Sequence, residues 1–289
     1  MTSVARYPRR RNSTMAAAVL TLPTMLILTI AACSAQPPSV TVGIAKMRDA
    51  DRLYQQQKYD EAAVLAAEVG KTFTDNAELQ QDAACLLFLS GKVEESLPLF
   101  DRANELSPRL RPHNWQRGCA LGCAGKFAEG AAQFKLHHDV NPNDVENSAW
   151  YYLCVAKSKS KEEADKAVIP SGGDPRPPMM DVLKMLKGSI SPEELLTTIK
   201  SESYAGPAGK TAKFYGFLYV GLYYDSIGEE SKAMQALDDC LAVSEPDYMG
   251  RTARHYRRLR FPPPKNEASK GSDAATSKES SAGKEKAPK

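Results

Sequence analysis

The sequence predicts an all-α fold built as an array of helical hairpins. Four pairs of identical residues recur at a spacing of 34 positions: Gly91 and Gly125, Phe100 and Phe134, Pro108 and Pro142, and Cys85 and Cys119. Around them, apolar residues follow the helical period, a glycine stands where a turn is needed, and a proline follows the second helix. An apolar fraction of 42% in 289 residues allows a substantial core. The spacing therefore indicates a repeated helix–turn–helix unit.

The period and the residue classes at each position resemble the tetratricopeptide repeat. Gly91 and Gly125 stand at the turns, and Phe100 and Phe134 lie on the helices that follow them. The resemblance implies an α-solenoid, in which each hairpin packs on the next one and first helices line a concave side.

The folded domain is expected to span residues 43–260. We expect tetratricopeptide-type hairpins at residues 43–76, 77–110, 111–144 and 214–247, with a degenerate hairpin at 145–168. An irregular helical insertion at 158–208 contains a proline-rich loop, a helix over 179–186, and a capping box in which Ser191 precedes Glu194 by three residues. A final helix over 247–260 is expected to cap the exposed apolar face of the last hairpin.

The N-terminus has the layout of an export signal. Four arginines precede an uncharged, mostly apolar run over 15–32, which is typical of a secretory signal. Ile30, Ala31 and Ala32 directly before Cys33 resemble the bacterial lipobox. That resemblance implies a signal peptide at 1–32, cleavage before Cys33, and acylation with a diacylglycerol thioether on Cys33. The residues also leave open an uncleaved transmembrane anchor of about 18 residues or an ordinary signal peptide.

Two flanking segments are expected to lie outside the folded domain. Residues 33–42 are predicted to form a membrane tether, and Ser34 after the cysteine favours the outer membrane by analogy with bacterial sorting. The segment 261–289 has no aromatic residue after Phe261 and consists largely of Lys, Ser, Ala, Glu and Gly. Such a composition buries too little apolar surface to fold, so a disordered tail is expected.

Charge and cysteine content narrow the classes of partner and site. Without residues 1–32, 34 basic residues (38 minus the four arginines) stand against 35 acidic residues, a net charge of −1. This balance gives no indication of nucleic-acid binding. Five cysteines remain besides Cys33, and an odd number argues against a complete disulfide framework in an oxidising compartment.

The first helices of the hairpins supply a candidate partner-binding groove. Its predicted lining residues are Tyr54, Phe88, Trp115, Cys119 and Leu153. We expect this apolar, aromatic surface to receive a hydrophobic peptide or helix of another protein. The alternative is that Phe88 and Trp115 are buried between helices.

The last helix carries a candidate basic surface formed by Arg251, Arg254 and Arg258. Anionic lipid or an acidic partner could bind there. The alternative is a solvated helix face, with cations placed favourably near a helix C-terminus.

No metal, cofactor or catalytic chemistry is expected. Cys119 and Cys123 share a helical face, but a zinc site needs three or four converging ligands, so packing is the favoured role of these cysteines. The sequence contains no Ser–His–acid grouping, phosphate-binding loop or zinc-protease motif. The chain is therefore predicted not to be an enzyme.

Several stretches resemble the NlpI family of bacterial tetratricopeptide-repeat lipoproteins. They are residues 117–121, 139–144, 148–153, 184–195 and 214–228, within a resemblance that covers roughly 44–260. The resemblance implies a non-catalytic adaptor of the outer membrane, facing the periplasm, that dimerises and brings a protease together with peptidoglycan hydrolases. The cysteine-rich third hairpin, the loop 170–178 and the Lys-rich tail depart from that family. The alternatives are a structural subunit of a secretion or outer-membrane assembly machine, or a peptidoglycan or polysaccharide binder.

Overall fold

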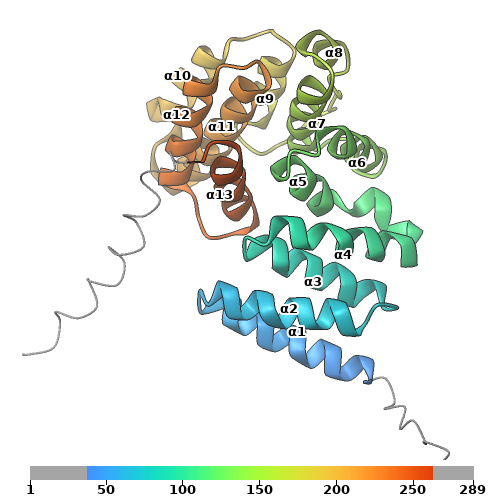
Figure 1. The fold of residues 1–289 in the computed structure, drawn as a ribbon. Helices are drawn as coiled ribbons and strands as arrows, with labels where there is room; N and C mark the ends of the chain where they lie inside the picture. The colour runs from blue at the N-terminus through green and yellow to red at the C-terminus, as the bar shows by residue number, and fades with distance from the viewer. Residues whose placement is uncertain (1–37, 263–289) are drawn as a thin grey trace, which may run out of the picture. The chain divides into compact units, whose positions relative to one another are not determined.

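The computed structural model describes residues 38–262, and these residues form an all-α array of consecutive helical hairpins. The fold class predicted from the sequence is confirmed. The first three hairpins are α1 (Val40–Gln55) with α2 (Tyr59–Thr72), α3 (Ala77–Leu89) with α4 (Val93–Leu106), and α5 (Trp115–Cys123) with α6 (Phe127–Val140). They follow one another from blue to green in Figure 1. A short 3-10 helix, η1 (Pro108–His113), precedes α5.

The second helices of these hairpins repeat in strict register. Each of α2, α4 and α6 contains 14 residues, and they begin at Tyr59, Val93 and Phe127, so each begins 34 residues after the previous one. Each is preceded by a turn residue with a left-handed backbone: Gln57 at φ 62°, Gly91 at φ 89° and Gly125 at φ 73°. Glycine adopts this conformation without steric cost, whereas an L side chain does not. The first hairpin therefore makes the same turn with a glutamine in the place of the glycine.

Small residues allow the helices of the third hairpin to approach closely. A Cβ atom added to Gly118 on α5 would lie 2.7 Å from the ring of Phe134 on α6. Because that distance is shorter than a van der Waals contact, only glycine lets the ring lie flat against the first helix at this point. Phe134 is accordingly 2% exposed.

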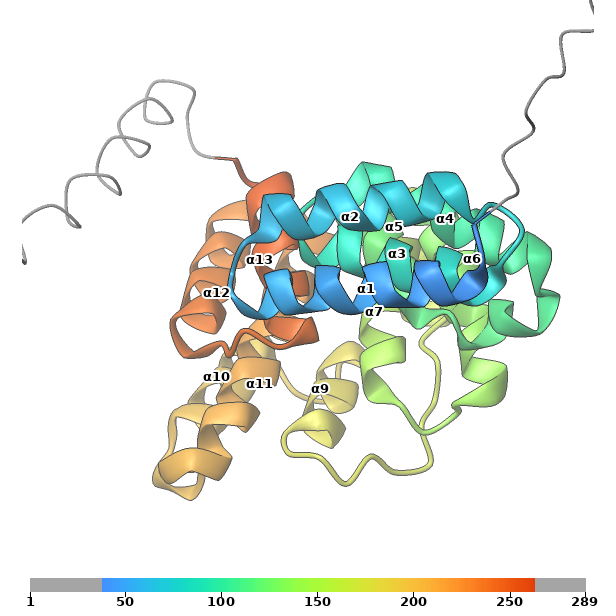
Figure 2. The ribbon, with the colours of Figure 1, turned by 90° about the horizontal axis from the view of Figure 1, so that it is seen from below.

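The second half of the array begins with α7 (Val145–Ser158) and the short α8 (Lys161–Lys166). It continues with α9 (Met179–Leu186), α10 (Pro192–Lys200), a 3-10 turn η2 (Glu202–Tyr204), α11 (Gly206–Ser226), α12 (Glu230–Val243) and α13 (Tyr248–Arg260). Helices α9 and α10 pack on α11, and α9 also packs on α7. Viewed from below, α11 and α12 lie beside each other while α1 and α2 lie at the front (Figure 2).

The capping box expected at the start of α10 is present. The Ser191 hydroxyl accepts a hydrogen bond from the Glu194 backbone N–H at 3.1 Å, and the Ser191 backbone N–H donates to the Glu194 carboxylate at 2.7 Å. These two bonds satisfy backbone donors that the first turn of a helix leaves free.

Three boundaries differ from the sequence-based expectation. Helix α1 begins at Val40, so the last residues of the expected tether 33–42 belong to the first hairpin. Helix α11 begins at Gly206 instead of near 214, because a proline at its first turn has the backbone angle that a helix start requires. Pro108 was expected only to end the preceding helix, but residues 108–113 form the 3-10 helix η1. The segment 1–32 expected to be a signal peptide, Cys33, and nearly all of the expected tail 261–289 lie outside the described residues.

Candidate functional site

Helix α13 lies across the side of the array formed by α3, α5 and α7, which we call the inner face. The ring centroid of Tyr248 lies 5.7 Å from that of Phe88 on α3 and 4.8 Å from that of Trp115 on α5. Further along α13, the Tyr256 ring packs edge-on against Trp150 of α7 at 5.6 Å. The last helix contacts α12, as a cap of the last hairpin would, but it also covers three first helices of the array.

The end of α3 holds one side of α13. Leu89 is the last residue of α3, and its carbonyl has no partner within that helix. The Arg251 guanidinium donates to this carbonyl at 2.9 and 3.0 Å, and the His255 ring nitrogen Nε2 lies 3.2 Å from it. Arg258 donates to the Gly91 carbonyl at 3.1 Å. Cationic side chains suit a helix C-terminus, because the carbonyl dipoles there are negative.

These contacts correct the basic surface expected at Arg251, Arg254 and Arg258. Arg251 is half-buried, and its guanidinium also lies 4.0 Å from the centroid of the Tyr59 ring. Arg251 and Arg258 therefore attach α13 to α3, and of the three predicted cations Arg254 and Arg258 are exposed. The three side chains thus do not form one uniformly free basic surface.

A buried carboxylate holds the other end of α13. Asp225 of α11 is 0% exposed and accepts hydrogen bonds from the Tyr256 hydroxyl, from Arg260 Nε at 2.9 Å and from Lys157 Nζ at 3.0 Å. Burial alone would raise the pKa of Asp225, but these three donors outweigh it and hold the pKa below its usual value. Both α13 and α7 are thus joined to α11 through one ionised group.

The structure does not leave an open hydrophobic groove at the predicted residues, because α13 of the same chain lies against Phe88 and Trp115. Phe88, Cys119 and Leu153 are at most 1% exposed. Tyr54 is half-buried and packs against Tyr59 with 5.3 Å between ring centroids, and Trp115 is half-buried under Tyr248. The alternative interpretation, burial between helices, describes Phe88 correctly.

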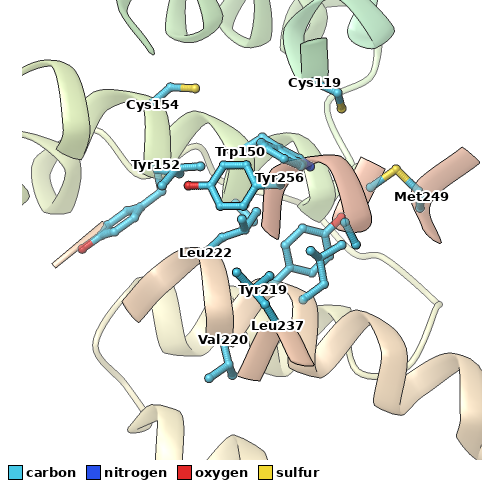
Figure 3. Packing of buried hydrophobic residues seen from close by; sticks show 14 of the residues in the cluster. Cys119, Trp150, Tyr152, Cys154, Tyr219, Val220, Leu222, Leu237, Met249 and Tyr256 are labelled. Carbon is cyan, nitrogen blue, oxygen red and sulfur yellow. The ribbon is translucent and has the colours of Figure 1, made fainter. Parts of the chain in front are cut away.

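A pocket of about 220 Å³ remains beside α13, and we call it the inner-face pocket. It is lined by Trp115, Cys119, Phe134, His137, Asp144, Glu146, Asn147, Trp150, Arg176 and Met249. Two of the predicted groove residues, Trp115 and Cys119, belong to this lining. Figure 3 shows Trp150 between Tyr256 and Cys119, with its indole nitrogen turned to the side on which Met249 lies.

Unpaired hydrogen-bonding groups are concentrated in this pocket. Asn147 and Trp150 are 2% and 1% exposed, and they lie three residues apart on one face of α7. Both polar atoms of the Asn147 amide, and the Nε1 atom of Trp150, have no hydrogen-bond partner among residues 38–262. Leaving such a buried group unpaired costs roughly 1–3 kcal/mol. Two of the residues that line the pocket thus carry buried polar atoms without a partner in the described part of the chain.

Charged residues form the rim of the pocket, and they pair with one another. Arg176, from the loop between α8 and α9, donates to Asp144 at 2.8 Å, to Asp174 at 2.7 Å, and to Glu146. The Tyr219 hydroxyl also donates to Glu146. Burial raises the pKa of Glu146, and the bonds from Tyr219 and Arg176 oppose that rise. This network holds the proline-rich loop over the start of α7.

Eight of the ten lining residues were not predicted as site residues, and three of these, Glu146, Asn147 and Arg176, carry most of the polar chemistry of the pocket. Asn147 could have been found, because it lies on the same helical stripe as Trp150 and Cys154, where a polar residue is out of place. Arg176 reaches Glu146 across 30 residues of chain, and no local pattern predicts such a contact.

The cysteines of the third and fourth hairpins pack in the core. Cys119, Cys123 and Cys154 are buried, and burial raises the pKa of each thiol. Burial likewise raises the pKa of Cys85 to about 12. Thiols of this kind stay protonated and unreactive at neutral pH. In the part of the chain that the structure describes, no three His, Cys, Asp or Glu side chains gather as a metal site would require.

The fold and the inner-face pocket together define a helical-repeat protein with a side-chain-sized pocket. Comparison of the sequence with models of known protein families and with curated proteins finds no match. Within residues 38–262, no helix has both the length and the apolar character needed to cross a bilayer.

Proposed function

We propose that this chain is an exported, lipid-anchored scaffold of the tetratricopeptide type that binds other proteins of the bacterial cell envelope and catalyses no reaction. The observation that carries the proposal is the inner-face pocket, in which buried Asn147 and Trp150 offer hydrogen bonds that no other described residue takes up. The acidic and basic groups at its rim are engaged with each other, which suits recognition better than proton transfer.

The cellular setting of the proposal comes from the N-terminal residues. The lipobox-like segment ending at Cys33 supports a membrane anchor, and Ser34 supports the outer membrane, facing the periplasm. The resemblance to the NlpI family supports a protease or peptidoglycan hydrolases as partners, and a homodimer. The first alternative is a structural subunit of a secretion or outer-membrane assembly machine. The second alternative, a polysaccharide binder, has less support because Arg251 and Arg258 hold α13.

The anchor is tested by comparing the full chain with its Cys33→Ala variant in bacterial cells. We expect the full chain in the membrane fraction with a radiolabelled fatty acid attached, and the variant unlabelled. A variant that incorporates the label as well would contradict acylation at Cys33.

The binding role is tested by affinity purification from detergent-solubilised membranes. Co-purified proteases or peptidoglycan hydrolases support the adaptor, assembly subunits support the first alternative, and glycan fragments alone support the second. Asn147→Leu should reduce capture, whereas Gln235→Leu, an exposed amide on α12, should not. Equal capture by both variants would remove the pocket from the proposal.

A further inference from the structure

We infer that the inner-face pocket binds the carboxamide of a glutamine or asparagine side chain in an extended segment of a partner protein. The inference rests on the proposed function and names the chemical group that the scaffold recognises.

The hydrogen-bonding groups of the pocket match an amide. Trp150 Nε1 offers one donor, and the Asn147 side chain offers donors on Nδ2 and an acceptor on Oδ1, all without partners among the described residues. A carboxamide presents an oxygen that accepts and a nitrogen that donates. One such group therefore has the donor and the acceptor needed to bond to Asn147 in both directions. A carboxylate, which has no donor for Asn147 Oδ1, fits only part of this set, and a hydroxyl has to place its donor and its acceptors on a single oxygen.

The charges at the rim disfavour an anionic ligand. Arg176 is already engaged by the carboxylates of Asp144, Glu146 and Asp174, so no cation is left for an incoming carboxylate. Both ring nitrogens of His137 also have neighbours: Nδ1 lies 2.9 Å from the Pro112 carbonyl, and Nε2 lies 3.4 Å from Asn141 Nδ2. Burying a carboxylate without a partner is costly, so an anionic group is disfavoured, and the neutral atoms of Asn147 and Trp150 that lack a partner among the described residues favour a neutral polar group.

Size and wall chemistry favour a side chain on a flexible segment. The volume of about 220 Å³ is below the roughly 300–1,000 Å³ of pockets that enclose a whole small molecule. The walls are apolar where Trp115, Phe134 and Met249 contribute, and such walls suit the methylene groups of a glutamine. A sugar ring would need an open aromatic face for stacking, but Phe134 and Trp150 are only 2% and 1% exposed, and the half-buried Trp115 ring already packs against Tyr248 at 4.8 Å. Peptide is therefore favoured over glycan.

The test uses the mature chain in detergent with its tryptophan indoles labelled by ¹⁵N. The chain has two tryptophans, Trp115 and Trp150, so two indole signals are expected, and Trp115→Phe assigns them. Glutamine blocked at both ends is titrated against blocked glutamate, blocked methionine and a chitin trisaccharide. We expect saturable movement of the Trp150 signal with blocked glutamine, at an affinity roughly fivefold above that for blocked methionine, as one or two net hydrogen bonds supply.

Asn147→Leu should abolish the preference for glutamine over methionine, and the matched control Gln235→Leu should retain it. If Asn147→Leu does not fold, Asn147→Asp keeps the shape, loses the Nδ2 donors, and should also lose the preference. An unchanged preference in the folded variant, tightest binding of methionine or glutamate, or tightest binding of the chitin trisaccharide would each overturn the inference.

The two proposals fail in different ways. Capture of envelope proteins that is independent of Asn147 would overturn the carboxamide site and leave the scaffold standing. If the pocket binds glutamine but the chain captures no envelope protein, the carboxamide site stands and the proposed scaffold role is overturned.

Discussion

Replacement of Asp225 by alanine tests how α13 is held on the inner face. The carboxylate is 0% exposed and receives hydrogen bonds from Tyr256, Arg260 and Lys157. Removing one partner of a buried ion pair typically costs about 3–5 kcal/mol, because it leaves a charge without compensation. The side chains of Lys157 and Arg260 are 18% and 33% exposed and can regain some water, so we expect the lower end, about 3 kcal/mol.

The assay is urea unfolding followed by tryptophan fluorescence, since Trp150 contacts Tyr256 and reports on α13. A thermal scan read by the same fluorescence should show a fall of roughly 6–12 °C in Tm, which is what about 3 kcal/mol corresponds to in a chain of this size. The matched control is Asp238→Ala. Asp238 is 52% exposed and pairs with Arg257, and this ion pair also joins α12 to α13. Exposed pairs contribute at most about 1 kcal/mol. Equal losses in the two variants would refute the role given to Asp225.

Three further predictions concern stability. Burial lowers the pKa of His255 to about 4, and the neighbouring arginines act in the same direction. Because an unfolded histidine has a pKa near 6.5, the unfolded chain takes up a proton before the folded one does. The free energy of unfolding should therefore fall by about 3 kcal/mol as the pH drops from about 6.5 to about 4. Denaturation at several pH values should show this loss, and His255→Gln but not the exposed His113→Gln should remove it. Gln57→Gly should raise the free energy of unfolding by about 0.5–1 kcal/mol, because φ is 62° there, whereas Gln56→Gly at φ −80° should not. Asn147→Leu should leave the thermal midpoint unchanged or raise it, and a fall of several degrees would mean that the amide has a partner.

The fold was predictable because its signals are local. Turn glycines, capping residues and the 34-residue period act within one or two hairpins, and they place turns such as that at Gly125 and the capping box at Ser191 correctly. The first hairpin was harder to recognise, because Gln57 stands where the other turns have glycine.

The candidate site was only partly predictable because it depends on distant segments. Trp115 and Cys119 were identified from their places on a first helix, and both line the pocket. The position of α13 was not foreseen, because Arg251 reaches Leu89 across 162 residues. The arginines of an amphipathic helix can face solvent or bind the carbonyl groups at the end of another helix. The sequence pattern is the same in both cases, and only the tertiary contact distinguishes them.

We expect partners to bind at the inner-face pocket. This pocket lies on the face that the chain covers with its own last helix. A photo-crosslinking amino acid at Trp115, half-buried in the pocket lining, tests this in bacterial cells against the same group at Val64, which is 67% exposed on α2. We predict a covalent adduct with an envelope protein from position 115 that disappears in the presence of Asn147→Leu, and none from position 64. Adducts formed only from position 64, or adducts from position 115 that persist with Asn147→Leu, would contradict the assignment.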